Sequence, residues 1–279
     1  MSGSGITPLT IGSLFSGIGG LELGLERAGV GSVAWQCEID PFCRAILAKH
    51  WPTATRFSDV TRPRSWPHVD LICGGFPCQD VSGIGSGRGI GGTRSSLWWH
   101  FARVVEQVAP AWVVVENVAS GARRWLHHVR HQLHLLGYRT RALGIAASNV
   151  GAPHFRRRIF VVAHADSVKL RQQSSRPRRK GETLARSNGQ ARPASDAGGV
   201  ARDVEQEGRK HVAGAWNGGR DGRAPVSPVR RVDDGVSRRL DAARKRALGN
   251  AVVPQCAEVV GKVILSMMDR DREEKEKRS

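Results

Sequence analysis

The chain has 279 residues, 40% of them hydrophobic, which is enough for one sizeable core and a smaller unit. Its formal net charge of +18 makes nucleic acid the first partner to consider, with a solubilising surface as the plain alternative. We find no signal-peptide pattern and no apolar run long enough to cross a bilayer, so we expect a cytoplasmic protein without a membrane partner. Five scattered cysteines favour free thiols and form no zinc pattern, so we expect no metal.

Short apolar runs alternate with helical stretches from residue 9 to residue 164. The expected strands are 10–15, 32–37, 54–58, 69–74, 111–116, 138–147 and 158–163. The expected helices are 19–29, 40–50, 95–109 and 122–137. This alternation predicts an α/β fold with a Rossmann-like, doubly wound and mostly parallel sheet.

The composition changes over residues 165–242, which are rich in Arg, Gly, Ser and Pro and poor in large apolar residues. This stretch is either a small, loop-rich domain or a segment that is partly disordered until it meets a partner. Apolar periodicity returns at 251–268 and predicts a helix that packs back on the first part. We therefore expect a catalytic domain of residues 1–164 plus 243–268, followed by a solvated, charged tail at 269–279.

A glycine turn near the N-terminus follows the first expected strand. Gly17, Gly19 and Gly20 permit a tight turn that brings backbone N–H groups toward a ligand, although a simple strand-to-helix connection has the same pattern. Glu38 ends the next strand, at the spacing of an acid that binds ribose hydroxyls. Asp59 follows the third strand and could accept a hydrogen bond from an adenine amino group. With both acids present, an adenosine-bearing cofactor is the better interpretation.

The turn departs from the dinucleotide pattern G-x-G-x-x-G. Gly17-Ile18-Gly19-Gly20 is followed by Leu21 and Glu22, and a carboxylate here would repel a pyrophosphate. S-adenosylmethionine carries an adenosine without phosphates, so it fits this turn better.

Cys78 lies in the run Cys-Gly-Gly-Phe-Pro-Cys-Gln-Asp-Val-Ser, directly after an expected buried strand. Ligands of open α/β sheets bind at the carboxyl ends of the strands, so this thiol is a candidate nucleophile. Glu116 ends the strongest apolar strand, and Arg156 and Arg158 begin a later one. Each also has an ordinary interpretation: a surface acid for Glu116 and a solvated edge for the arginines. Asn250, just before the returning helix, could likewise be a helix cap.

Taken together, these residue types suit chemistry at carbon 5 of cytosine, which is a poor nucleophile by itself. A thiolate that adds to carbon 6 makes the ring an enamine, provided that an acid serves N3 and a cation holds O2. Cys78, Glu116 and Arg158 are candidates for the nucleophile, the acid and the electrostatic stabiliser. A base within a duplex must first leave the stack to be reached.

The sequence resembles the DNA (cytosine-5) methyltransferase family. The motifs, in the family's order, are Phe15-Ser16-Gly17-Ile18-Gly19-Gly20, Pro77-Cys78-Gln79, Glu116-Asn117-Val118, Arg156-Arg157-Arg158 and Gly249-Asn250-Ala251-Val252-Val253-Pro254. The resemblance implies that Cys78, Glu116 and Arg158 are catalytic, with Arg156 as a helper. It implies S-adenosylmethionine contacts from Phe15, Gly17, Gly19, Gly20, Glu38, Asp59, Leu97 and Asn250.

The resemblance also implies a mobile loop at Gly83–Gly92 and a target-recognition domain at 165–242, in which Val226–Leu240 holds the place of the family's closing motif. It implies a monomer acting on double-stranded DNA, with a restriction endonuclease for the same site as a further partner. Three alternatives stay open: a methyltransferase for cytosine in transfer RNA, a binding protein with a decayed site, and a nicotinamide-dependent dehydrogenase.

Overall fold

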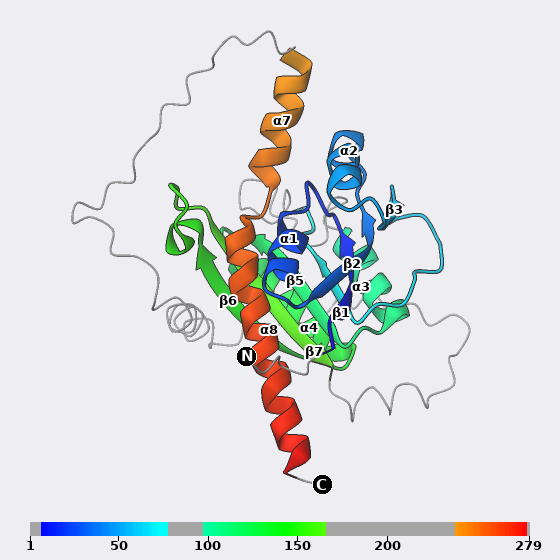
Figure 1. Ribbon diagram of the computed structural model, residues 1–279, viewed down its shortest axis with the longest axis vertical. Helices are drawn as coiled ribbons and strands as arrows, with labels where there is room; N and C mark the ends of the chain where they lie inside the picture. Colours follow the sequence, from blue (N-terminus) through cyan, green and yellow to red (C-terminus); the bar gives the residue numbers. More distant parts are fainter. Residues whose placement is uncertain (1–6, 78–96, 166–237, 278–279) are drawn as a thin grey trace, which may run out of the picture.

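The computed structural model describes residues 7–77, 97–165 and 238–277. Its centre is a seven-stranded sheet with the order β3-β2-β1-β4-β5-β7-β6 (Figure 1). The strands are β1 (Leu9–Leu14), β2 (Gly31–Cys37), β3 (Thr55–Phe57), β4 (Leu71–Gly74), β5 (Trp112–Val118), β6 (Tyr138–Ala146) and β7 (Arg157–Ala165). The helices are α1 (Gly20–Arg27), α2 (Pro41–His50), α3 (Leu97–Val108), α4 (Ala122–Leu135), the short 3-10 helix η2 (Ala147–Val150), α7 (Arg238–Asn250) and α8 (Pro254–Glu276).

Only β7 runs against the other strands of this sheet, because it pairs antiparallel with both β5 and β6. The pairs from β3 to β5 are all parallel. The prediction of a doubly wound, mostly parallel sheet is therefore confirmed. Each of the seven expected strands and four expected helices corresponds to an element of the fold.

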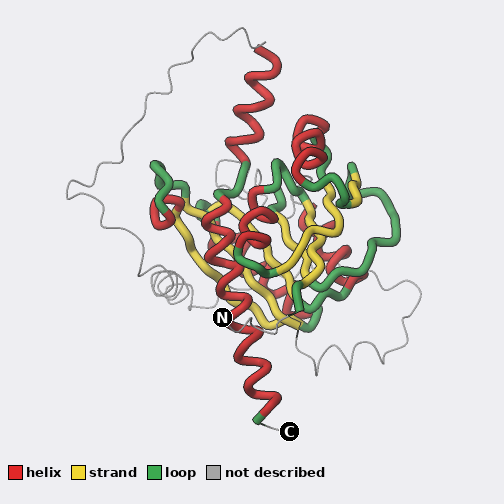
Figure 2. Tube along the Cα trace, viewed as in Figure 1, coloured by secondary structure: helices red, strands yellow, loops and turns green. Residues whose placement is uncertain are grey.

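Both faces of the sheet are covered by helices, which explains why its central strands are apolar without interruption (Figure 2). On one face, β5 and its neighbours pack against α3 and α4 through residues such as Trp98, Phe101 and Val129. On the other face, α1 and α8 supply Leu25 and Val260 to a second cluster. The sheet is thus the middle layer of three.

The C-terminal part differs from the expected helix over 251–268. A separate helix, α7, ends at Asn250, and α8 begins only at Pro254, where a proline suits the first helical position. α8 continues to Glu276, so most of the charged tail is helical, although residues 272–277 are exposed. The sequence signal for α7 was weak because that helix is mostly polar.

α8 packs along α1 through small residues. A Cβ on Gly24 would lie 2.4 Å from that of Ala257, and one on Gly261 would lie 2.4 Å from that of Ala28. By length and composition alone, the helical stretch Ala242–Glu276 could span a membrane, since an 18-residue window has a mean hydropathy of 1.4. Of that window, 33% is buried in the described structure, in part against α1.

The carboxyl edge of the parallel strands brings several of the predicted site residues together. β1, β2, β4 and β5 all end there, and the antiparallel β7 begins there, with Arg158 opposite Val118. Segments far apart in the sequence therefore meet at this carboxyl edge. α7 rises beyond it, and the charged end of α8 lies at the opposite end of the molecule (Figure 1).

Candidate active site at the carboxyl edge of the sheet

The site is built around Glu116, near the end of β5. Its carboxylate accepts a hydrogen bond from Arg158 at the start of β7, with 2.8 Å between Arg158 Nε and Glu116 Oε1. Both side chains are largely buried, with 19% of Arg158 and 10% of Glu116 exposed. The antiparallel register of β5 and β7 brings these two residues together from positions 42 apart in the chain.

The loop after β4 lies directly against this pair. A Cβ on Gly75 would be only 2.5 Å from Glu116 Oε2, so a glycine is needed for the carboxyl to occupy its place. The neighbouring Asn117 donates a side-chain hydrogen bond to the Phe76 carbonyl at 3.1 Å. These contacts hold the Gly75–Pro77 segment beside the end of β5. Cys78, the next residue, lies outside the described residues.

Burial raises the pKa of Glu116 to about 7, and the nearby charges of Arg158 and Arg156 oppose that rise. The carboxyl is consequently able to hold or release a proton near neutral pH. Arg156 itself lies just before β7 and is half-buried. It donates a hydrogen bond from Nη1 to the Leu248 carbonyl of α7, at 3.5 Å. Arg158 thus contacts the carboxyl of Glu116 directly, and the charge of Arg156 acts on it without a direct contact among those described.

The glycine turn between β1 and α1 occupies the neighbouring part of the edge. Phe15 has a positive φ of 56°, which is unusual for a residue other than glycine, and Gly17 and Gly19 have φ of 57° and 86°. A Cβ on Gly19 would meet Trp51 at 2.4 Å, and one on Gly20 would meet the Val252 carbonyl at 2.2 Å. The turn is therefore tight because α2 and the 251–253 segment pack against it.

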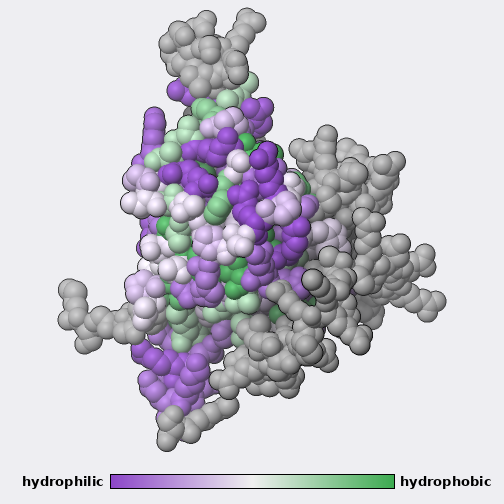
Figure 3. Space-filling view, turned by 90° about the vertical axis from the view of Figure 1, so that its right-hand side faces the viewer, coloured by the Kyte–Doolittle hydropathy of each residue, from purple (hydrophilic) through white to green (hydrophobic). Residues whose placement is uncertain are grey.

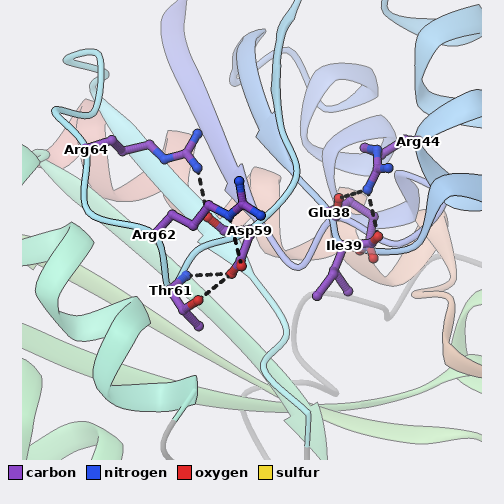
Figure 4. A network of polar contacts seen from close by, with 7 residues as sticks. All are labelled: Glu38, Ile39, Arg44, Asp59, Thr61, Arg62 and Arg64. Atoms are coloured by element: carbon purple, nitrogen blue, oxygen red, sulfur yellow. Dashed lines mark hydrogen bonds and ion pairs between the residues drawn. The ribbon is translucent and has the colours of Figure 1, made fainter.

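Glu38 follows β2 and is fixed by the backbone at both oxygens. Oε2 accepts from the Gly17 N–H at 2.7 Å, and Oε1 accepts from the Asp40 N–H at 2.8 Å. Ile39, between the two acids, exposes 72% of its surface. Figure 4 shows Glu38 and Ile39 on one loop of the edge and the Asp59 network on the next.

Asp59 is held by its own loop. Its Oδ1 accepts from the backbone N–H and hydroxyl of Thr61 at 2.8 and 2.7 Å, and its Oδ2 lies 3.6 Å from Arg62 Nε. The hydrogen bonds from Thr61 lower the pKa of Asp59, so it is ionised at neutral pH. Glu38 and Asp59 are thus two fixed acceptors on neighbouring loops.

The two remaining predicted cofactor residues lie on other elements. Leu97 begins α3 and packs, partly buried, on the same core cluster as Phe15. Asn250 is the last residue of α7 and is exposed, while the segment after it contacts the glycine turn through Val252.

Gly75 and Asn117 lie within the sequence motifs, but the sequence alone did not assign either of them a contact in the site. The Gly-Gly pair before Phe-Pro-Cys was the available signal, because a close approach often requires glycine. The loop Gly83–Gly92, residues 166–237 and most of Val226–Leu240 lie outside the described residues. The roles expected for them stay predictions.

The family model for C-5 cytosine-specific DNA methylases matches residues 9–217 of this chain. The chain belongs to that family. Among curated relatives, it is 36% identical over 159 residues to the Type II methyltransferase M2.BsuMI of Bacillus subtilis, covering 54% of this chain and 41% of the relative. It is 29% identical over 171 residues to M.HhaI of Haemophilus parahaemolyticus, covering 59% and 52%.

Among solved structures, the Dnmt2 methyltransferase of S. pombe has a TM-score of 0.47 and 21% identity, covering 62% of this chain and 58% of that one. The chain spans about half the length, or less, of the curated relatives it matches. The family model thus shows the family of this chain, and the activity of the whole protein is a proposal.

Proposed function

We propose that this protein transfers a methyl group from S-adenosylmethionine to carbon 5 of a cytosine in double-stranded DNA. The observation that carries the proposal is the buried Glu116–Arg158 pair, 2.8 Å apart, against the Gly75–Pro77 segment that leads to Cys78. A carboxyl with a pKa of about 7 beside a guanidinium suits the N3 and O2 atoms of a cytosine ring. Membership of the methylase family supports the same reaction.

In the proposed mechanism, the Cys78 thiolate adds to carbon 6, and a C–S bond forms as the carbon 5–carbon 6 double bond opens. Glu116 delivers its proton to N3, and Arg158 holds O2, so the electron pair is drawn through the ring and then made available at carbon 5. Arg156 adds a second positive charge near Glu116. Once carbon 5 carries the methyl group, a base removes the carbon 5 proton and N3 returns its proton to Glu116. The C–S bond then breaks, the carbon 5–carbon 6 double bond re-forms and the thiolate leaves.

S-adenosylmethionine, when bound, supplies an electrophilic methyl group on a sulfonium. The chain's residues fit it, because each Glu38 oxygen accepts one backbone hydrogen bond and keeps a lone pair for a ribose hydroxyl. We assign Asp59 to the adenine amino group and the turn of Phe15, Gly17, Gly19 and Gly20 to the rest of the ligand. Leu97 and Asn250 complete the proposed cofactor set.

The substrate is proposed to be a cytosine extruded from a specific duplex sequence. We assign residues 165–242 to target recognition, because their arginines suit both phosphate contacts and guanine readout. We further propose that the protein acts as a cytoplasmic monomer, since one chain carries every required group, and that a restriction endonuclease of the same specificity accompanies it.

The test is incubation with radiolabelled S-adenosylmethionine and duplex DNA, followed by nucleoside analysis. We expect label in 5-methylcytosine and none with Cys78→Ser, while Cys43→Ser serves as a control at another cysteine. Label in adenine, label in transfer RNA instead of DNA, or full activity of Cys78→Ser would overturn the assignment.

A further inference from the structure

α7 buries little of its surface against the rest of the described fold, and most of its charged residues are positive. Five of its 13 residues are Lys or Arg and one is Asp. Over Ala242–Asn250, where side chains are described, Ala247 is the single buried residue. An isolated helix of about this length is marginal in water, so a helix with so little burial is expected to gain stability from a partner.

The base of α7 is tied to the proposed site at two points. The Leu248 carbonyl accepts from Arg156 at 3.5 Å, and Arg156 is one of the two arginines that act on Glu116. On the cofactor side, Arg246 Nε lies 3.8 Å from Asp40 Oδ2, two residues from Glu38. The helix therefore stands on the rim between the target-base corner and the cofactor loops.

From that rim α7 projects beyond the carboxyl edge, away from the three layers (Figure 1). Arg244 and Lys245 are exposed along this projecting part, and 65% of the Arg246 side chain is exposed as well. Exposed cations beside a site for an extruded base suit the negative charge of the neighbouring phosphates.

We propose that α7 contacts the phosphate backbone of the DNA duplex beside the target cytosine, through Arg244 and Lys245. The inference rests on the proposed function, which supplies duplex DNA as the partner. Phosphate contacts fix the position of a protein on DNA without reading its sequence. α7 would accordingly contribute affinity and orientation, and leave the choice of sequence to other residues.

The experiment compares two double variants of the full chain that each remove two positive charges. Arg244→Ala with Lys245→Ala removes them from α7, and Arg270→Ala with Arg272→Ala removes them from the opposite end of α8. That end is a hydrophilic block at the bottom of the molecule (Figure 3). The Kd for a fluorescent duplex is measured over a series of KCl concentrations, together with kcat and the Kd for S-adenosylmethionine.

We expect the α7 variant to make the plot of log K against log salt shallower by up to about 2, because each phosphate contact contributes a slope of about 0.9. Its DNA Kd should rise about tenfold or more at moderate salt, with kcat and cofactor Kd unchanged. The α8 variant should keep the wild-type slope. A charge-reversal variant, Arg244→Glu with Lys245→Glu, should enlarge the effect.

Equal slopes for the two alanine variants would overturn the proposal, because net charge alone would then explain binding. The proposal would also fail if the α7 variant lowered Tm and left the slope unchanged. In that case Arg244 and Lys245 would contact other residues of the chain and stabilise the fold, and would not contact DNA. A wild-type protein that binds DNA with this slope pattern but methylates no cytosine would instead contradict the proposed function, and α7 would still be judged by the slopes.

Discussion

Glu116 and Glu22 are both buried carboxyls, and burial raises the pKa of each to about 7, but they lie in different surroundings. Glu116 faces Arg158 at the edge of the sheet. Glu22 lies in the first turn of α1, beneath the glycine turn, where the nearby polar side chains of Ser13, Ser16 and Gln36 are neutral. Among the described residues, neither of its oxygens has a partner at hydrogen-bond geometry.

The comparison shows that a raised pKa does not by itself identify a catalytic acid. At Glu116, a cation and a glycine loop surround the carboxyl at the edge of the sheet, where 10% of the side chain is exposed. Glu22 is 0% exposed, and its charge faces the buried thiol of Cys73, whose pKa it helps to raise. We therefore expect a Glu→Gln substitution to lower activity at Glu116 and to change stability at Glu22.

The largest effect should come from Glu116→Gln. The variant removes the proposed general acid, so kcat should fall by about 10²- to 10⁴-fold. The wild-type kcat/KM should decline as pH rises through about 7, because Glu116 then loses the proton that N3 requires. The variant should lack this decline. The measurement is the pH profile of methyl transfer in steady state.

A matched control for that experiment is Glu106→Gln on the exposed face of α3. It removes the same charge at a position away from the carboxyl edge, and its rate and pH profile should equal those of the wild type. If Glu116→Gln kept the alkaline decline, another group would be the acid and the contrast with Glu22 would lose its basis.

A smaller effect is expected from Gly75→Ala. The new Cβ would lie 2.5 Å from Glu116 Oε2, so the carboxyl or the loop must move, and we expect kcat to fall about tenfold. Gly261→Ala is the control, because its Cβ would crowd Ala28 at 2.4 Å in the α1–α8 contact. It should cost stability, about 1–3 kcal/mol, and leave kcat unchanged. Equal losses of kcat in both variants would show that crowding acts through the fold as a whole.

The sequence predicted the sheet well because each strand is a short apolar run bounded by glycines or polar residues. The arginines begin their strand and reach the carboxyl edge because β7 runs antiparallel to β5. The sequence predicted that Glu116 would share that edge with Cys78, since the carboxyl ends of parallel strands meet there. It did not predict that Arg158 pairs directly with Glu116, which follows from the register of the antiparallel β7. Registers between distant strands leave little trace in a single sequence.

Two further features were beyond sequence reasoning for a related reason. α7 is a polar helix whose single buried residue over Ala242–Asn250 is Ala247, so no apolar periodicity marks it. From the sequence, Glu22 is a carboxylate near the ligand turn. Its complete burial depends on how α1 lies against β1 and β2. Both depend on packing between elements, which local patterns do not specify.

Glu22→Gln should have the smallest effect on activity and a clear effect on stability. A folded-state pKa of about 7, above the ordinary 4.5, means that the folded protein binds more protons than the unfolded chain between these values. Below pH 4.5, the shifted pKa of Glu22 does not change the free energy of unfolding. As pH rises, it lowers that free energy, by at most about 3 kcal/mol above pH 7. The neutral glutamine avoids the cost.

The free energy of urea unfolding should therefore favour the variant at pH 8 and converge on the wild-type value at pH 5, while kcat changes less than twofold. Glu116 titrates in both proteins, so its contribution cancels in the difference. A variant that is equally destabilised at both pH values would mean that the glutamine cannot fit among Ser13, Ser16 and Gln36. A variant that loses methyl transfer with its fold intact would instead give Glu22 a part in the chemistry, and the distinction between the two carboxyls would disappear.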